Sequence, residues 1–252
     1  MAKIKIVIQK LIDMNKFKII RSLFYKIQKE TFPKDMENEF GEIYEKCKFY
    51  TMTSRARMYA LYQAVKYIVK SKVQGDFVEC GVWKGGSTML IALTLLKCEE
   101  ANRKIYLYDT FEGMPKPTSK DQRITDGKQS YNIWKQGPWC NASLDEVKKN
   151  MLSLGYPETN VIFIKGKVED TIPENIPPQI SLLRLDTDFY ESIYHELKHL
   201  FPLILNKGVI IIDDYGYWAG VKEATDKYFS ENAITMLLNR IDQAGRLGIK
   251  IR

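Results

Sequence analysis

Pairs of aspartates stand directly after two apolar segments of this 252-residue chain. Asp186 and Asp188 follow SLLRL, and Asp213 and Asp214 follow GVIII. Helix N-capping by Asp188 and Asp214 would explain one acid at each place, but not two. Because ionised carboxylates are costly to bury unpaired, the four side chains indicate a ligand site. Oxygen donors from Asp186, Asp213 and Asp214 suit Mg²⁺, Mn²⁺ or Ca²⁺ better than zinc.

A glycine-rich turn follows an earlier apolar segment, DFVECGVW over 76–83. Gly81, Gly85 and Gly86 would let a ligand approach the backbone closely and let the next helix pack tightly. Asp109 ends the following apolar segment, where an acidic side chain can hydrogen-bond a ribose diol. The turn matches neither the G-x-G-x-x-G of ordinary NAD binding nor the G-x-x-x-x-G-K-[ST] phosphate loop. A tight turn without a ligand is the alternative interpretation.

The segments that carry these residues alternate with helical patterns from residue 75 to residue 231. This alternation predicts a parallel sheet with helices on both faces, and continuous apolar runs such as VIFI fit strands that are buried on both sides. The carboxyl ends of parallel strands share one rim, where ligands bind. We therefore expect Glu79 and Asp109 to lie near the four aspartates. The predicted strands cover 76–83, 104–110, 160–166, 181–188 and 208–215.

The last two apolar segments, ITMLLNRI and GRLGIKIR, have no helix between them and predict an antiparallel hairpin at one edge of the sheet. The predicted fold class is therefore α/β, a Rossmann-like sheet that is mostly parallel with an antiparallel C-terminal edge, preceded by N-terminal helices.

A long irregular stretch over 111–142 interrupts the alternation and contains three prolines together with Tyr131, Trp134 and Trp139. Loops of this length are usually functional or disordered. The stretch is predicted to be a lid that keeps water out of a reaction site. A segment that only covers the core is the alternative.

Two short motifs suggest other activities. The segment His195–His199 matches the zinc-binding pattern H-E-x-x-H, but the chain has only these two histidines, so a solvated helix face explains it better. Asp186-Thr187-Asp188 resembles the D-x-D of glycosyltransferases that bind a nucleotide sugar through a metal ion. A metal-dependent D-x-D glycosyltransferase is therefore the alternative function.

The basic excess of the chain is confined to its N-terminus. The net charge is +7, and residues 1–30 alone hold eight Lys or Arg against two acidic residues, so the nearly neutral body argues against nucleic-acid binding. Apolar residues at helical spacing over 4–27 predict a basic amphipathic helix that either packs on protein or rests on an anionic membrane. No transmembrane run or signal peptide is expected. Four scattered cysteines indicate reduced thiols and a cytoplasmic protein.

Several segments occur together in an order and spacing that resemble the macrocin O-methyltransferase family, the sugar O-methyltransferases of macrolide and aminocoumarin pathways. The resemblance extends over roughly 50–244. The family often has Gly where this chain has Thr187. The segments are DFVECGVWKGGS, YDTFEGMP, LDEVKKN, FIKGKVEDTIP, LRLDTDFYES, GVIIIDDY and NRID, with TMTSRARMYALYQAV as a looser match.

The resemblance implies a class I methyltransferase fold, S-adenosylmethionine as methyl donor, a divalent cation (usually Mg²⁺) and a sugar hydroxyl as acceptor. It also implies a homo-oligomer. Asp188 corresponds to the general base, and the metal ligands correspond to Asp186, Asp213 and Asp214. The implied cofactor residues are Glu79, Gly81, Gly85, Gly86, Ser87, Asp109, Gly166 and Val168.

The expected organisation is a basic helical extension over 1–45 and an S-adenosylmethionine-dependent methyltransferase domain over 46–252, with the lid inserted near 111–142. Peripheral membrane contact through residues 1–30 would suit a membrane-associated sugar acceptor. A non-catalytic protein that keeps a relic of the cofactor pocket is a further alternative, but such relics tend to lose their acidic ligands, and all four aspartates are present.

Overall fold

The computed structural model describes residues 32–137 and 139–251. The chain divides into two compact units, Met1–Gly41 and Glu42–Arg252. In the first unit, the rings of Phe32 and Phe40 meet edge to face with their centroids 5.8 Å apart. The amphipathic segment expected over 1–30 lies outside the described residues. Within the described ranges, no helix is long and apolar enough to cross a membrane.

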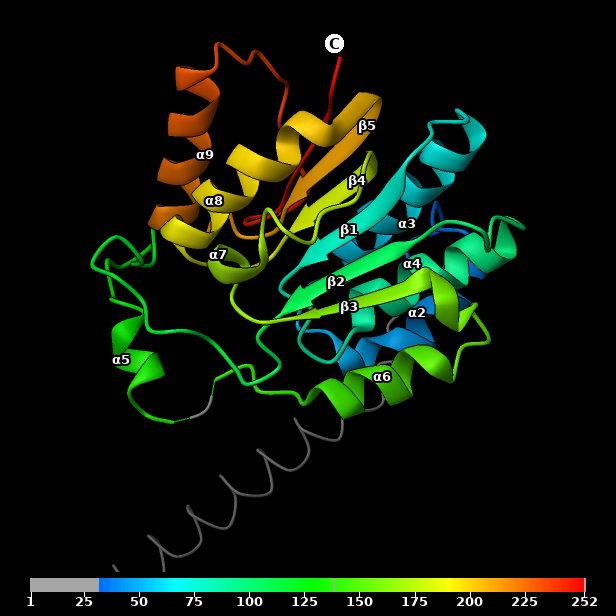
Figure 1. Ribbon diagram of the computed structural model, residues 1–252, viewed down its shortest axis with the longest axis horizontal. Helices are drawn as coiled ribbons and strands as arrows, with labels where there is room; N and C mark the ends of the chain where they lie inside the picture. Colours follow the sequence, from blue (N-terminus) through cyan, green and yellow to red (C-terminus); the bar gives the residue numbers. More distant parts are fainter. Residues whose placement is uncertain (1–31, 138, 252) are drawn as a thin grey trace, which may run out of the picture. The chain divides into compact units, whose positions relative to one another are not determined.

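The second unit is built on a seven-stranded sheet with the order β3-β2-β1-β4-β5-β7-β6 (Figure 1). Strands β1 to β5 are parallel, and β7 and β6 are added antiparallel at the β5 edge. This confirms the predicted fold class, including the C-terminal hairpin. The strands are β1 (Asp76–Cys80), β2 (Ile105–Asp109), β3 (Val161–Lys165), β4 (Ile180–Leu185), β5 (Ile204–Ile212), β6 (Asn239–Arg240) and β7 (Arg246–Ile249).

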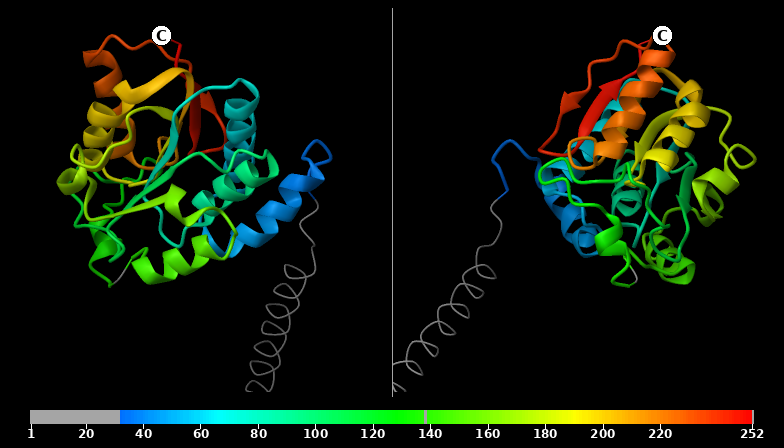
Figure 2. Two further views of the ribbon diagram at one scale, coloured as in Figure 1. Left: turned by 45° about the vertical axis from the view of Figure 1, so that its right-hand side comes forward. Right: turned by 90° about the vertical axis from the view of Figure 1, so that its left-hand side faces the viewer.

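Helices cover both faces of this sheet (Figures 1 and 2). Helices α3 and α4 pack against each other on one face, and α6 packs against α4. Helices α7, α8 and α9 lie on the opposite face, where their apolar residues join those of the strands in one core. Their bounds are α3 (Arg55–Lys70), α4 (Gly86–Lys97), α6 (Leu144–Leu152), α7 (Val168–Thr171), α8 (Tyr190–Leu200) and α9 (Ala219–Glu231).

The burial of the central strands explains their composition. All six residues of β4 are buried, as are the last five of β5, because helices cover both sides. The first ten residues of α4 are also buried, which fits the apolar run TMLIALTLL. Ser54 caps α3 by accepting the backbone N–H of Arg57, and Ser143 caps α6 by accepting that of Glu146.

The strand ends differ from their predicted positions in a way that matters for the site. Strands β1, β4 and β5 end three residues earlier than the sequence suggested, at Cys80, Leu185 and Ile212, so the aspartate pairs lie in loops beyond the strands. Strand β5 also begins earlier, at Ile204. Helix α8 ends at Leu200 and gives way to a short 3₁₀ turn, Phe201–Leu203, because Pro202 cannot continue it.

The remaining short elements are the helices α2 (Asn38–Cys47) and α5 (Tyr131–Trp134) and the 3₁₀ turns η1 (Lys48–Tyr50) and η2 (Glu158–Asn160). Helix α5 belongs to the irregular stretch over 111–142. That stretch contains an antiparallel bridge between Gln122 and Gln129, and a second bridge joins Arg123 to Trp218. The Gln122–Gln129 bridge lies within the stretch, and the Arg123–Trp218 bridge attaches its middle to the chain that leads into α9.

Candidate functional site

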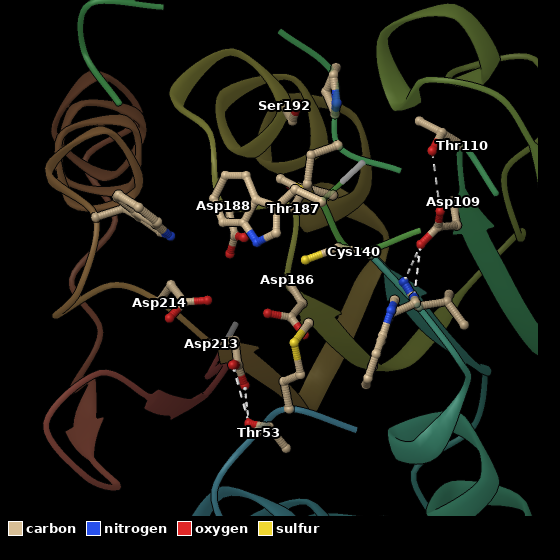
Figure 3. Close-up of a pocket in the computed structure, with 18 of the residues that line it drawn as sticks. Thr53, Asp109, Thr110, Cys140, Asp186, Thr187, Asp188, Ser192, Asp213 and Asp214 are labelled. Carbon is tan, nitrogen blue, oxygen red and sulfur yellow. Dashed lines mark hydrogen bonds between the residues drawn. The ribbon is translucent and has the colours of Figure 1, made fainter. Parts of the chain in front are cut away.

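A cavity of about 450 Å³ opens at the carboxyl ends of the parallel strands, among the loops that follow β1 to β5 (Figure 3). Most of the residues singled out in the sequence line it. Glu79, Gly85 and Gly86 do not line it; Glu79 is fully buried, and the two glycines lie at the start of α4. The candidate residues that do line it are Gly81, Ser87, Asp109, Gly166, Val168, Asp186, Asp188, Asp213 and Asp214.

Three carboxylates converge in this cavity. Single oxygens of Asp186, Asp188 and Asp214 all lie within 4.8 Å of one another (Figure 3). Burial raises the pKa of Asp188 to about 7, against the lowering effect of a hydrogen bond with Asp214. Burial, with neighbouring negative charge, also raises the pKa of Asp186 and Asp214 well above the usual range. Three carboxylate oxygens held close together, despite burial and mutual repulsion, are suitable ligands for a divalent cation such as Mg²⁺.

Asp213 lines the cavity, as its sequence position suggested, but arginine and threonine side chains hold it and it is not one of the three converging carboxylates. Its Oδ1 accepts a hydrogen bond from Nη2 of Arg184 at 2.6 Å, and the hydroxyl of Thr53 lies 3.1 and 3.2 Å from its two oxygens (Figure 3). Its Oδ2 is also bound by the guanidinium of Arg57. The converging triad thus contains Asp188, whereas the metal ligands expected from the family resemblance contain Asp213.

A buried arginine forms ion pairs with three carboxylates at the floor of the cavity. The side chain of Arg184 is 2% exposed and lies between Glu79, Asp186 and Asp213, with Nη1 2.8 Å from the Asp186 carboxylate. Glu79 is fully buried, and it also accepts a hydrogen bond from Ser87. An always-charged planar guanidinium suits this position because it can pair with several carboxylates at once. Glu79 therefore supports the cavity through Arg184 and Ser87.

Sequence reasoning missed both Arg57 and Arg184. A signal for Arg184 is present, since an arginine inside the apolar strand LLRL must find a buried acidic partner. Arg57 carries no such signal, because a helical arginine is usually exposed.

The glycine turn after β1 is held by Asp109. One oxygen of this carboxylate accepts the backbone N–H groups of Val82 and Trp83 at 2.7 and 2.9 Å, and the other accepts that of Phe111 at 2.7 Å. Gly81 has a φ of +84°, and a Cβ there would lie 2.1 Å from the carbonyl oxygen of Asp186. Only glycine therefore lets the β1 and β4 loops meet at the cavity.

The loop that carries the D-x-D motif is held by a hydrogen bond to α8. Asp188 has a positive φ of 64°, which is uncommon for a residue with a side chain. The hydroxyl of Thr187 donates to Oε2 of Glu196 at 3.2 Å, and Glu196 is fully buried in α8. Glu196, the glutamate of the H-E-x-x-H motif, thus binds the D-x-D loop through Thr187. Among the described residues, neither His195 nor His199 belongs to a group that could hold a metal.

The stretch over 111–142 contributes part of the cavity wall and is anchored by Asp121. This side chain is fully buried, and its two oxygens accept the N–H groups of Tyr190 at 2.8 Å and Thr118 at 2.7 Å. Tyr190 is the first residue of α8, so Asp121 satisfies one of the free N–H groups at the start of that helix. The wall residues from this stretch are Gly113, Met114, Pro115, Ile133, Trp139 and Cys140.

Asp121→Ala is expected to lower the free energy of unfolding by about 1–3 kcal/mol, because it leaves the buried N–H of Tyr190 without its acceptor and removes the bonds from Thr118. Limited proteolysis should then cut faster within 111–142. Asp126→Ala is the matched control, since Asp126 lies in the same stretch but forms an exposed pair with Arg123. Equal proteolysis of the two variants would show that Asp121 does not anchor the stretch.

Comparisons with known proteins point to one family. Residues 12–247 match the family model of the macrocin-O-methyltransferases (TylF). The chain is 30% identical over 196 residues to a demethyldecarbamoylnovobiocin O-methyltransferase from Streptomyces niveus, covering 78% of this chain and 74% of that one. It is 30% identical over 207 residues to a mycinamicin III 3''-O-methyltransferase from Micromonospora griseorubida, covering 82% and 80%.

The solved structure of the O-methyltransferase NovP is similar in fold, with a TM-score of 0.72 and 28% identity over 81% of this chain and 83% of that chain. The calicheamicin methyltransferase CalS11 aligns with a TM-score of 0.56 and 17% identity over 87% of this chain and 95% of its own, a likeness of fold alone.

Proposed function

The chain belongs to the macrocin O-methyltransferase family, and on that premise we propose that it moves a methyl group from S-adenosylmethionine to a hydroxyl of a sugar, with Mg²⁺ or another divalent cation in the site. One observation carries the proposal. The same cavity joins a glycine turn held by Asp109 to the converging carboxylates of Asp186, Asp188 and Asp214. A cofactor and an acceptor could therefore meet there.

The cofactor half of the proposal concerns the β1, β2 and β3 ends of the cavity. Gly81 and Ser87 would face the amino-acid part of the cofactor, with Gly85 and Gly86 shaping the turn and Glu79 supporting it from behind. Asp109 would hydrogen-bond the ribose through Oδ1, because that oxygen accepts one N–H bond and a long 3.4 Å contact from the Thr110 hydroxyl, which a ribose hydroxyl could replace. Gly166 and Val168 line the cavity beyond β3 and would lie along the adenine.

The metal half concerns the β4 and β5 ends. Five carboxylates meet two guanidinium groups there, which leaves a negative excess that a divalent cation would reduce. Asp186, Asp213 and Asp214 are the proposed ligands, and Asp188 could contribute an oxygen as well. A bound cation would lower the pKa of an acceptor hydroxyl and fix its orientation.

The chain's own residues would then carry the proton. Asp188 would accept the hydroxyl proton as the oxygen attacks the methyl carbon, and the carbon–sulfur bond would break to release S-adenosylhomocysteine. A carboxylate whose pKa lies near 7 can take up and release a proton close to neutral pH. The loop around Thr187 would keep this carboxylate in place.

The acceptor is proposed to be a sugar on a natural product or on a polysaccharide or nucleotide-sugar precursor. The two relatives named above are a demethyldecarbamoylnovobiocin O-methyltransferase and a mycinamicin III 3''-O-methyltransferase. Trp139 and Trp218 meet with ring centroids 6.0 Å apart at the cavity wall and offer an apolar surface to such an acceptor. The stretch over 111–142 would act as the lid. The family match does not favour a D-x-D glycosyltransferase.

Several expectations about the rest of the chain stay predictions. They are the division into an extension over 1–45 and a methyltransferase domain over 46–252, membrane contact through 1–30, assembly into a homo-oligomer, and a cytoplasmic location.

Calorimetric titration of S-adenosylhomocysteine into the purified chain, once with Mg²⁺ and once with EDTA, tests the proposal. We expect binding at about micromolar Kd in Mg²⁺, in the range of cofactor sites that turn over. EDTA should abolish methyl transfer to an acceptor found by screening glycosides. Absence of binding in both buffers would discard the cofactor assignment, and full transfer activity in EDTA would discard the metal.

A further inference from the structure

Arg57 places a positive charge beside the proposed metal ligands, from a different element than they occupy. It lies in the first turn of α3, lines the cavity, and is 15% exposed. One edge of its guanidinium binds the carboxylate of Asp213 and lies 3.8 Å from Oδ1 of Asp214. The opposite edge, Nε, lies 3.1 Å from Oδ2 of Asp242. The guanidinium thus bridges two acidic groups.

Asp242 is built as a fixed anchor for this guanidinium. Its Oδ1 accepts the backbone N–H groups of Ala244 and Gly245, both at 2.8 Å, and its Oδ2 accepts the hydroxyl of Ser54 at 2.6 Å. Burial alone would raise the pKa of Asp242, but these hydrogen bonds and the charge of Arg57 hold it below the usual range. Asp242 is the last residue of the NRID segment, one of those that resemble the family, and its structural role here is to anchor Arg57.

The absence of a side chain at Gly245 leaves room for the aliphatic part of the Arg57 side chain. A Cβ at Gly245 would lie 2.8 Å from Cδ of Arg57, so glycine leaves room for the arginine to reach both acidic groups. Arg184 differs from Arg57 in this respect, because it is buried beneath the carboxylates and paired with Glu79. Arg57 is therefore the cation on the cavity side of the carboxylates, where a metal ion would also lie.

We propose that Arg57 competes with the divalent cation for the carboxylates of Asp213 and Asp214, and that Asp242 limits this competition by holding the Nε edge. The inference rests on the proposed metal site. A guanidinium and a metal ion that share the same carboxylates repel each other, so each weakens the binding of the other. Arg57 would thus neutralise the ligands when no metal is bound and keep the bound metal exchangeable.

The competition would also reach the segment that precedes α3. Thr51, Met52 and Thr53 line the cavity, and Thr53 hydrogen-bonds Asp213. When Arg57 yields its place on the Asp213 carboxylate, its Nε and the Ser54 hydroxyl would still hold the start of α3 to Asp242. Arg57 is in this sense a positioning residue, because it acts through the carboxylates and the α3 segment.

Binding of Mn²⁺ to the full chain without cofactor or acceptor, followed by calorimetry and by the electron paramagnetic resonance of free Mn²⁺, tests the inference. Arg57→Gln should tighten Mn²⁺ binding roughly tenfold, because it removes a positive charge that contacts Asp213 and lies 3.8 Å from Asp214. Asp242→Asn should weaken binding severalfold, because the freed guanidinium can settle fully on Asp213 and Asp214. Opposite signs from two substitutions in one ion pair are hard to obtain from general destabilisation.

Two further variants sharpen the result. In the double variant Arg57→Gln/Asp242→Asn, the weakening by Asp242→Asn should disappear, because its effect runs through Arg57. Arg240→Gln removes the same charge from an exposed side chain whose Nε donates to the backbone carbonyl of Asp242, and it should leave Mn²⁺ affinity within about twofold at physiological salt. Thermal melts of each variant identify any that fail to fold.

The outcomes separate this inference from the proposed function. If the wild-type chain binds Mn²⁺ and Arg57→Gln binds it equally or more weakly, the competition is refuted while the metal site stands. If neither chain binds Mn²⁺, both the metal assignment and the competition are refuted. Binding by Arg57→Gln alone would support the competition in its strongest form.

Discussion

Asp188→Asn is expected to lower kcat about 10²- to 10⁴-fold at saturating Mg²⁺, the usual range for loss of a general base. Asparagine keeps the shape of the side chain and its hydrogen-bonding oxygen, but it cannot take up the proton of the acceptor hydroxyl. Because Asp188 is not among the residues proposed to hold the cofactor, the Kd for S-adenosylhomocysteine should change by less than about twofold.

The measurement is methyl transfer under initial-rate conditions, with cofactor affinity and Mn²⁺ affinity recorded for the same preparation. Asp170→Asn is the control, because Asp170 is an exposed acid on α7 that does not line the main cavity. A variant with undiminished kcat would remove Asp188 as the base. A fall that Mg²⁺ excess restores would reassign Asp188 to metal binding.

Arg184→Met is expected to destabilise the fold by about 3–5 kcal/mol, the usual effect of removing one partner of a buried ion pair. Methionine fills similar volume but leaves Glu79, Asp186 and Asp213 without their shared positive charge. Urea unfolding followed by circular dichroism gives the free energy. Adding Glu79→Gln to this variant should recover part of the loss, because one uncompensated carboxylate is then gone.

An exposed ion pair provides the comparison for this result. Lys165 and Glu112 pair on the surface with side chains 50% and 71% exposed, so Lys165→Met should change the free energy of unfolding by less than about 1 kcal/mol. If Arg184→Met were as mild as Lys165→Met, the buried network would not be a structural requirement of the cavity floor.

The strand-end carboxylates could be predicted because the alternating pattern fixes one rim of a parallel sheet. Asp186, Asp188 and Asp214 follow their strands directly, and the topology brings them together whatever the details of packing. Gly81 could be singled out for the same reason, since it follows β1 and its neighbour across the rim is the β4 loop. Local sequence and sheet order suffice for these residues.

The partners of these carboxylates could not be predicted, because they come from distant segments. Arg57 reaches Asp213 across 156 positions, and Thr53 reaches it across 160. No local pattern indicates such a contact, which depends on how α3 lies against β4 and β5. The side-chain arrangement around Asp213 depends on these distant partners. The sequence therefore predicted that Asp213 belongs to the site but not what holds it.

The bond between Asp121 and the first residue of α8 restricts how this enzyme can be re-engineered. The stretch over 111–142 is the obvious segment to exchange between relatives when a different acceptor is wanted. The same stretch, however, supplies an acceptor for the N–H of Tyr190, two residues after Asp188. A chimera that carries a foreign loop without an acid at this place would change the proposed acceptor wall while loosening the start of α8, the helix that follows the proposed base Asp188. Exchanges should therefore keep Thr118 to Ser130 and vary the residues on either side.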